Sequence, residues 1–309
     1  MGVKMNSIEK QLLEQIADLH SIPEGSYSIR KNGKSFKINS TEDIQIVPKE
    51  DLPGIDIFVK EGVKGKSLHI PAIVTEGGIN DLVYNDFYIG KGADILIVAG
   101  CGVHNNSDQN SNHDGIHSFH LEEGACVRYV EKHIGSGSGK GEKILNPTTT
   151  IVMEKGSHFE METSQLGGVS YSDRKTKALL KEEAVLVVKE KILTTDFQEA
   201  KTIFDVTLKG KNSSVNVISR SVAKEFSRQK FVSVVKGQNE CFGHVECDGI
   251  VLDNAVVESS PRVIAKNENA TLVHEASIGK IAGEQILKLQ TLGLSEDEAR
   301  DEIIKGFLR

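Results

Sequence analysis

Short apolar runs separated by polar turns follow one another along most of this chain. Between about residue 41 and residue 276, β-branched runs alternate with turns rich in glycine, asparagine and aspartate, and no helical pattern intervenes. Examples lie at 55–59, 93–98, 185–188 and 231–235. Short strands at this spacing predict an all-β architecture. Because similar rungs continue for roughly 200 residues without a linker, we expect a solenoid, most simply a β-helix, and not a divided β-sandwich.

An amphipathic helix and a hairpin are predicted ahead of that region. Apolar residues recur at helical spacing over 6–20, where Asn6 can cap the helix and Glu9 can complete a capping box. Two alternating runs then flank Asn32 and Gly33, a dipeptide typical of tight hairpin turns.

Two short helices are predicted at the C-terminal end. The first covers 283–292 and stops at Gly293, and Ser295 with Glu298 forms a capping box that opens the second. Helices this short are not stable alone, so they must pack on the β-region or on another protein. We therefore expect three parts: a helix and hairpin over 1–40, a β-helix core over 41–276 and a helical subdomain over 277–309.

Composition narrows the class of protein. The net charge of −7 argues against a nucleic-acid-binding protein, which would usually carry a basic face. No run approaches the ~18 apolar residues of a membrane span, and the first residues lack the apolar core of a signal peptide. Four cysteines in such a chain favour free thiols over a disulfide framework. We expect a globular protein of the cytoplasm.

The first candidate site lies near the C-terminal end of the β-region. Cys247 stands between Glu246 and Asp248 in a strand-like run, and His274 and Glu275 follow at the end of the next runs. Thiolate is the ligand that iron–sulfur clusters prefer, although a free cysteine in a strand is most often a small buried apolar residue. Neighbours in a strand point to opposite faces, so we expect only one of His274 and Glu275 to face a given site.

A second set of donors lies in the first half of the chain. It consists of Cys101, His104, His113, His117 and His120. The Cys-x2-His spacing followed by His-x3-His resembles zinc spacing, and iron can use the same ligands. The intervening segment 105–112 is a polar loop, and histidines near such loops are often merely solvated. A weaker copy, Cys241 with His244, lies close to Cys247 and could join that site.

Two enzyme motifs are missing. The glycine-rich stretch 135–141 is one residue short of a phosphate-binding loop, and no Ser or Thr follows Lys140. The chain also lacks a Gly-x-Ser-x-Gly nucleophile elbow. We expect any ATP site to belong to a partner, and this chain not to be an enzyme.

The C-terminal segments 274–285, 293–299 and 303–307 resemble the C-terminal signature of the SufB/SufD proteins, scaffold components of the SUF iron–sulfur cluster assembly system. The resemblance implies a right-handed parallel β-helix core and a C-terminal helical subdomain that docks an ABC-type ATPase, SufC. It also implies pairing of scaffold subunits through the β-helix, and a transient cluster built from sulfide that a sulfur donor protein supplies.

The same resemblance assigns roles to three residues. Cys247 and Glu275 match the cysteine and glutamate implicated as SufB cluster ligands, and His274 matches the neighbouring histidine, where SufD contributes its own ligand. Bacterial SufD usually lacks both the cysteine and the glutamate, so the chain is SufB-like at this site. It is much shorter than bacterial SufB, which leaves both a homodimer and a heterodimer with a related scaffold subunit open.

The resulting interpretation is a non-catalytic scaffold for iron–sulfur cluster assembly that works with a SufC-like ATPase. Two alternatives stay open: a SufD-like structural partner without its own cluster, and a β-helix carbohydrate lyase or hydrolase. The second would present paired carboxylates or a carboxylate–Arg cluster on one β-face and is usually secreted.

Overall fold

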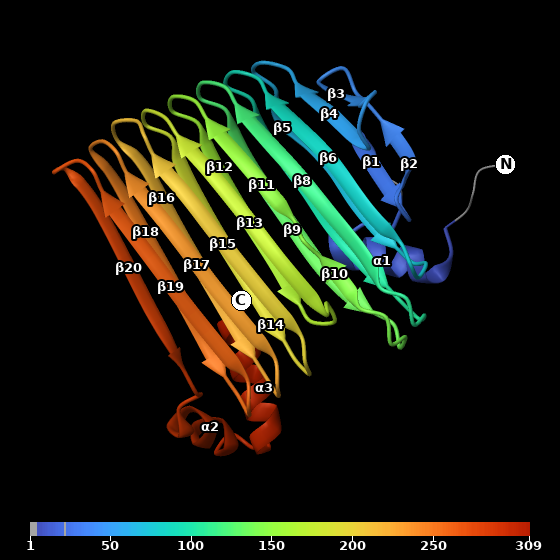
Figure 1. Cartoon of the computed structure of the whole chain (residues 1–309), viewed down its shortest axis with the longest axis vertical. Coiled ribbons are helices and arrows are strands. Elements are labelled where there is room, and N and C mark those ends of the chain that lie inside the picture. The colour runs from blue at the N-terminus through green and yellow to red at the C-terminus, as the bar shows by residue number, and fades with distance from the viewer. Residues whose placement is uncertain (1–4, 22) are drawn as a thin grey trace.

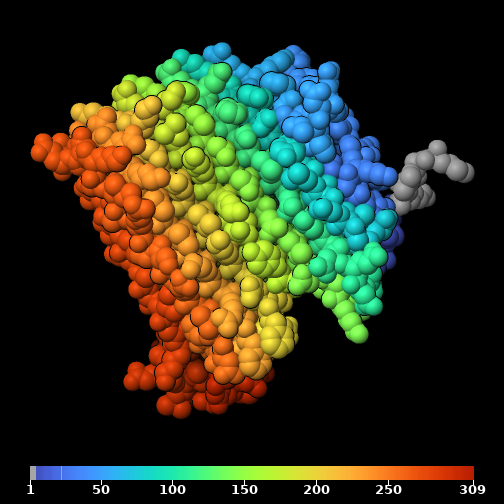
Figure 2. Space-filling model, in the orientation of Figure 1, coloured from blue at the N-terminus to red at the C-terminus, as the bar shows by residue number. Residues whose placement is uncertain are grey.

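The computed structural model describes residues 5–21 and 23–309, and it forms a parallel β-solenoid of about eight turns (Figure 1). A helix lies beside its N-terminal turns, and two helices lie at its C-terminal end. Colour runs in order from one end of the molecule to the other, so successive turns stack in sequence order (Figure 2). The β-helix expected from the strand pattern is confirmed.

Two ten-stranded sheets face each other across the interior. The first, sheet A, contains in spatial order β2 (Lys34–Asn39), β1 (Ser26–Lys31), β5 (Lys64–Val74), β7 (Asp94–His104), β9 (Cys126–Ser136), β12 (His158–Leu166), β14 (Val185–Thr194), β16 (Ser213–Ala223), β18 (Cys241–Val251) and β20 (Ala270–Gly279). The second, sheet B, contains β3 (Ile44–Pro48), β4 (Gly54–Val59), β6 (Asn80–Ile89), β8 (Ser111–Leu121), β10 (Lys143–Leu145), β13 (Tyr171–Leu180), β15 (Glu199–Leu208), β17 (Arg228–Gly237) and β19 (Val256–Ala265), with β11 (Thr148–Met153) also between β8 and β13.

Strands of neighbouring turns pair in parallel and almost without register shifts, so like positions stack in columns that run along the solenoid. Alternate side chains point inward, as a strand requires. One such column is apolar and passes through Val188, Val217 and Val245. The next inward column in the same strands carries Glu190, Ser219 and Cys247. The interior therefore holds an apolar layer and a polar layer side by side.

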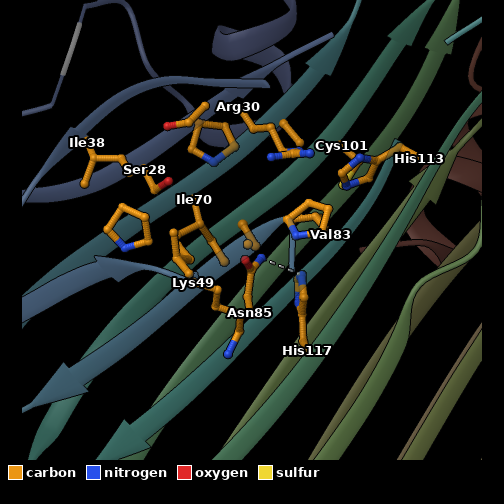
Figure 3. Close-up of a pocket in the computed structure, with 18 of the residues that line it drawn as sticks. Ser28, Arg30, Ile38, Lys49, Ile70, Val83, Asn85, Cys101, His113 and His117 are labelled. Carbon is orange, nitrogen blue, oxygen red and sulfur yellow. Dashed lines mark hydrogen bonds between the residues drawn. The ribbon is translucent and has the colours of Figure 1, made fainter. Parts of the chain in front are cut away.

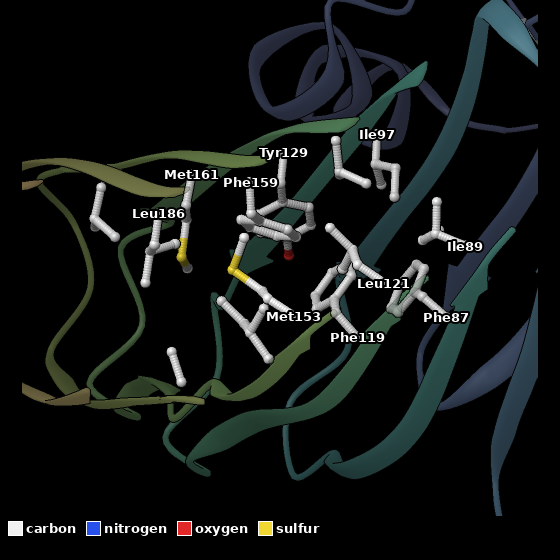
Figure 4. Packing of buried hydrophobic residues seen from close by; sticks show 14 of the residues in the cluster. Phe87, Ile89, Ile97, Phe119, Leu121, Tyr129, Met153, Phe159, Met161 and Leu186 are labelled. Carbon is white, nitrogen blue, oxygen red and sulfur yellow. The ribbon is translucent and has the colours of Figure 1, made fainter. Parts of the chain in front are cut away.

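The apolar layer contains stacked aromatic rings in its N-terminal half (Figure 4). Phe87 and Phe119 are parallel with ring centroids 4.2 Å apart, and Phe159 meets Phe119 edge-on at 5.0 Å. Tyr129 packs against both Phe119 and Phe159 and is fully buried. Such in-register contacts between turns stabilise each rung only through its neighbours, which is the physics of a solenoid.

The N-terminal helix α1 (Ser7–Ala17) covers the outer face of sheet A at β5, β7 and β9. The predicted capping box forms, with Asn6 and Glu9 bonded to each other's backbone amides. On β7, Gly100 faces this helix, and a Cβ added there would lie 2.6 Å from the carbonyl oxygen of Ile16. The close approach of helix and sheet therefore requires glycine at that position.

The C-terminal helices α2 (Gly283–Gln290) and α3 (Glu296–Phe307) pack only in part on the solenoid. The capping box predicted at Ser295 and Glu298 forms. Ile304 of α3 joins a buried cluster with Val222 of β16, whereas α2 buries none of its residues. Among the residues that the structure describes, no helix is long and apolar enough to cross a membrane.

Candidate functional site

The last two strands of sheet A, β18 and β20, place the three C-terminal candidates Cys247, His274 and Glu275 on two different faces. β18 and β20 pair in register, with Val245 opposite His274, Glu246 opposite Glu275 and Cys247 opposite Ala276. Because Val245 and Cys247 are buried and point inward, their register places His274 on the interior face and Glu275 on the outer face. The structure thus brings Cys247 and His274 to one face and separates Glu275 from them.

Cys247 is a buried, protonated thiol. Its exposed fraction is 1%, and it contributes to the apolar core. Burial raises its pKa to about 11, although the nearby Ser259 hydroxyl lowers it in part. The thiolate that a metal requires is therefore not the resting form of this residue.

His274 has an imidazole with two free nitrogens. It is half-buried on the last strand of sheet A, and neither ring nitrogen has a hydrogen-bond partner within the described chain. Desolvation lowers its pKa, and the neighbouring His244 lowers it further. A neutral imidazole has one ring nitrogen with a free lone pair, and that nitrogen is a competent ligand for iron.

The interior is uncovered at this end of the solenoid. β20 and β19 are the last strands of their sheets and pair with neighbours on one side only. Val263 and Ile278, whose register places them on the interior faces, are 46% and 39% exposed. An unprotected sheet edge of this kind is a template for pairing with another chain.

The second predicted set divides between the two faces. Cys101, His113 and His117 point into the interior, whereas His104 and His120 lie on the outer face. Nε2 of His104 accepts a hydrogen bond from the side-chain amide of Asn106, and its Nδ1 lies 2.9 Å from the Ser136 hydroxyl. The ring of His120 stacks on Tyr88 with centroids 5.1 Å apart. Five donors therefore do not converge on one ion, and only the three inward residues share a site.

These three residues line a cavity of about 220 Å³ at the N-terminal end of the interior (Figure 3). Figure 3 shows Cys101 beside His113, with Arg30 nearby and His117 hydrogen-bonded to Asn85. Burial by itself would raise the pKa of the Cys101 thiol, but the charges of His113 and His133 beside it lower that pKa to about 7.

The Cys101 thiol is paired with a histidinium. Burial lowers the pKa of His113, but the Cys101 charge and a 2.8 Å hydrogen bond to Asp81 outweigh it and raise the pKa to about 10. Asp81 is held in turn by Arg30, which donates from Nε to Oδ2 at 2.9 Å. At neutral pH the thiol is therefore substantially a thiolate next to a positive charge, the arrangement that makes a cysteine nucleophilic.

A row of buried polar side chains continues from this cavity toward the C-terminal thiol. His133, the in-register neighbour of Cys101, contacts Arg174 with 3.1 Å between its Nδ1 and Nη2. Arg174 donates to Glu131 at 2.5 Å, and its Nε lies 3.9 Å from a Glu190 carboxylate oxygen. Glu190 accepts a 2.7 Å bond from Ser219, which stacks directly against Cys247 in the next turn. A row of buried polar side chains thus runs from the Cys101 cavity to Ser219, the in-register neighbour of Cys247.

Most of this row was not predicted from the sequence. Its members are Asp81, Glu131, His133, Arg174 and Glu190. A signal existed in β9, where Val127, Tyr129, Glu131 and His133 occupy one face of a single strand and extend an apolar face with charged residues. Charged residues at core positions of a strand are costly unless they are paired, so they indicate a buried network.

The structure thus combines a parallel β-solenoid with two interior thiols and, at its open end, an imidazole and carboxylates, all of them donor groups of the kind that iron binds. Comparison with known proteins agrees. Residues 84–307 match the family model described as SUF system FeS cluster assembly, SufBD core domain. The chain therefore belongs to the SufBD family of iron–sulfur cluster assembly proteins.

Relatives cover nearly the whole chain. An iron-sulfur cluster assembly SufBD family protein of Methanocaldococcus jannaschii is 25% identical over 98% of this chain and 99% of its own length. A protein of the same description from Pyrococcus horikoshii is 29% identical over 89% of this chain and 84% of its own. One from Archaeoglobus fulgidus is 28% identical over 91% and 73%.

Proposed function

We propose that this protein is a scaffold on which an iron–sulfur cluster is assembled transiently, and that it acts as a binding protein of the cytoplasm and not as an enzyme. The observation that carries the proposal is the row of buried polar side chains that runs from a reactive thiol, Cys101, to Ser219, the in-register neighbour of a protonated thiol, Cys247. The cluster is the cargo of this protein, and it leaves for other proteins.

Cys101 is the residue suited to accept sulfur. It is a thiolate near neutral pH and borders a cavity, so it can attack the outer sulfur of a donor protein's persulfide; that sulfur then stays on Cys101 and the donor leaves as a thiolate. Cys101 with His113 also stays our candidate for an interior metal site, at which a metal ion would displace the second proton of His113. Asp81 holds the other nitrogen of His113, as carboxylates hold metal-ligating histidines. A thiolate-to-metal charge-transfer band with Co²⁺ that is lost in Cys101→Ala would support that use.

Cluster assembly itself is assigned to the open last turn. Cys247 and His274 share the interior face there, and Glu275 lies on the other side of the same strand. Because Cys247 is buried and protonated, it becomes a ligand only when β20 moves away from β18. The free edges of β19 and β20 fit a second scaffold subunit, either another copy of this chain or a related protein, which would complete the site.

The C-terminal helices are the proposed docking site for a SufC-like ABC ATPase. Leu287 on α2 and Leu292 after it are 61% and 72% exposed, which leaves an apolar surface for a partner. On the other side, Arg220 of β16 donates to the Phe307 carbonyl of α3 at 3.4 Å and stacks near its ring. β16 pairs with β18, the strand that carries Cys247. A displacement of α3 would therefore be transmitted through β16 to the neighbourhood of Cys247.

Co-expression with the ATPase partner followed by anaerobic reconstitution with iron and sulfide tests the proposal. We expect visible absorption of a cluster in the wild type and its loss in Cys247→Ala, with folding and partner binding intact. Cys126→Ala is the matched control, because Cys126 lies on the outer face of β9 away from the buried polar row. Equal cluster yield in Cys247→Ala and Cys126→Ala would refute the assignment.

Two other results would favour the alternative functions. A stable complex without a chromophore in any variant would indicate a SufD-like structural subunit. Absence of a complex together with activity on polyuronides would indicate a carbohydrate-active β-helix enzyme.

A further inference from the structure

The outer face of the last turn carries a second group of donor atoms that is separate from the interior thiol. His244 and Glu246 of β18 and Glu275 of β20 each offer one ligand atom, and these atoms lie within 4.8 Å of one another. In the part of the chain that the structure describes, this is the one group of three such donors at that spacing.

The charges of this group are not balanced by the protein. Glu246 and Glu275 are directly opposite in register, an arrangement of like charges that destabilises a strand pair. Elsewhere on the outer face of sheet A, carboxylates are paired with lysines: Glu160 with Lys189 at 2.7 Å and Glu162 with Lys191 at 3.4 Å. Among the described residues, neither Glu246 nor Glu275 has a Lys or Arg nitrogen within 4 Å, and the contact of Glu275 is His244 Nε2 at 3.6 Å.

The histidine is already oriented as a ligand. Its Nδ1 lies 3.1 Å from Oδ1 of Asn216 on β16, so Nδ1 carries the proton and donates it to the amide oxygen. This leaves the Nε2 lone pair directed at the carboxylates. Nearly every metal-ligating histidine makes such a hydrogen bond at the ring nitrogen that does not bind the metal, and this bond fixes the tautomer.

We propose that His244, Glu246 and Glu275 bind a divalent first-row transition-metal ion, and that its physiological occupant is Fe²⁺. One imidazole and two carboxylates form a mixed nitrogen and oxygen donor set that suits Fe²⁺, Mn²⁺ and Zn²⁺. With bonds of ~2.1 Å, such an ion keeps its ligands no more than ~4.2 Å apart, so the exposed Glu275 needs only a small adjustment. Three protein ligands leave open positions, which allows the ion to exchange.

The position of this site gives it a use within the proposed function, on which this step rests. Glu246 and Cys247 are consecutive residues on opposite faces of β18. The bound iron would therefore lie on the outer face of the sheet, and the thiol lies on the inner face of the same strand. Only the last strand, β20, closes the edge between them. Movement of β20 away from β18 would expose Cys247 and also separate Glu275 from His244 and Glu246, so the ion would be released next to the exposed thiol in one event.

Manganese binding to the full chain, followed by the electron paramagnetic resonance of free Mn²⁺, tests the site without requiring a cluster. We expect about one ion per chain, and a loss of affinity of at least tenfold in Glu246→Gln and in His244→Gln. Asn216→Ala should weaken binding by roughly 10–100-fold, because it removes the orienting hydrogen bond. Anaerobic competition by Fe²⁺ should displace the bound Mn²⁺.

Two control variants show whether Mn²⁺ binding depends on this outer-face group alone. Glu199→Gln removes one exposed carboxylate from β15 and should not change binding. Cys247→Ala should bind Mn²⁺ as the wild type does, because the thiol faces the interior. Unchanged binding in both Glu246→Gln and His244→Gln, with circular dichroism showing that they fold, would overturn the site, and so would loss of binding in Cys247→Ala.

Cluster reconstitution then tests the use of the ion. Slower cluster formation at limiting Fe²⁺ in Glu246→Gln supports iron loading, whereas a wild-type rate together with lost Mn²⁺ binding would overturn that use. If instead Mn²⁺ binds to the wild type as expected and no cluster forms in the wild type or in any variant, the metal site stands and the scaffold function fails.

Discussion

Replacement of Arg174 by methionine should destabilise the protein strongly, because this residue is the central cation of the buried polar row. Arg174 is 5% exposed, and it contacts Glu131 at 2.5 Å, His133 at 3.1 Å and Glu190 at 3.9 Å. Methionine fills a similar volume but supplies no charge. The variant therefore leaves the Glu131 carboxylate and the Glu190 side chain in the interior without their main cationic partner.

The expected loss in the free energy of unfolding is about 3–5 kcal/mol, the cost of removing one partner from a buried ion pair. A whole domain is stabilised by only ~5–15 kcal/mol, so the effect should be plain in urea unfolding followed by circular dichroism. Lys177→Met is the matched control: Lys177 lies on the same strand but is exposed, and its loss should change stability by no more than ~0.5 kcal/mol.

The deficit should also depend on pH. Burial alone would raise the pKa of Glu131, but Arg174 and His133 hold it well below the ordinary value. A carboxyl with a depressed pKa contributes stability that is present above its unfolded pKa of ~4.3 and is lost as pH falls through the folded value. Without Arg174 the pKa of Glu131 rises, so the carboxyl takes up a proton in mild acid and relieves the unpaired charge. The difference between Arg174→Met and wild type should therefore shrink from pH 7 to pH 5.

Two outcomes would refute this reasoning. Arg174→Met could be as stable as Lys177→Met at pH 7, which would mean that the row is hydrated or rearranges at no cost. Alternatively, the deficit could stay constant between pH 7 and pH 5, which would assign it to lost packing and not to charge.

Three further results are expected. Iodoacetamide should alkylate Cys101 with a rate that is half-maximal near pH 7, because the lowered pKa of Cys101 makes the thiolate available there. Cys247 should react only after denaturation. Mass spectrometry of the alkylated protein would show the reverse order if the assignment were wrong. Gly100→Ala should detach α1 and reduce the free energy of unfolding by about 1–3 kcal/mol through overpacking. Gly279→Ala is the control, because a Cβ added there has free space, and it should change stability little. Equal thermal stability of the two variants would contradict the tight contact at Gly100. Leu287→Asp should leave thermal stability unchanged but reduce retention of the ATPase partner in a pull-down, and full retention would exclude α2 as the docking site.

The sequence by itself determined the features that depend on neighbouring residues. The strand period, the turns, the Asn6 and Ser295 helix caps and the hairpin at Asn32 all arise from contacts within a few positions, and all are present. Neighbouring side chains in a strand point to opposite faces, and this rule correctly predicted that His274 and Glu275 lie on different faces of β20.

Only the tertiary structure decided which residues meet inside. Cys101 and His133 become neighbours because one turn of the solenoid returns the chain to the same position, and no strict repeat in the sequence reveals that register. The same stacking buries Cys247, places Glu275 opposite Glu246 and sends His104 and His120 outward. Register and burial are set by the packing of whole turns against each other, so the ionisation of the two thiols was decided there and not by their local sequence.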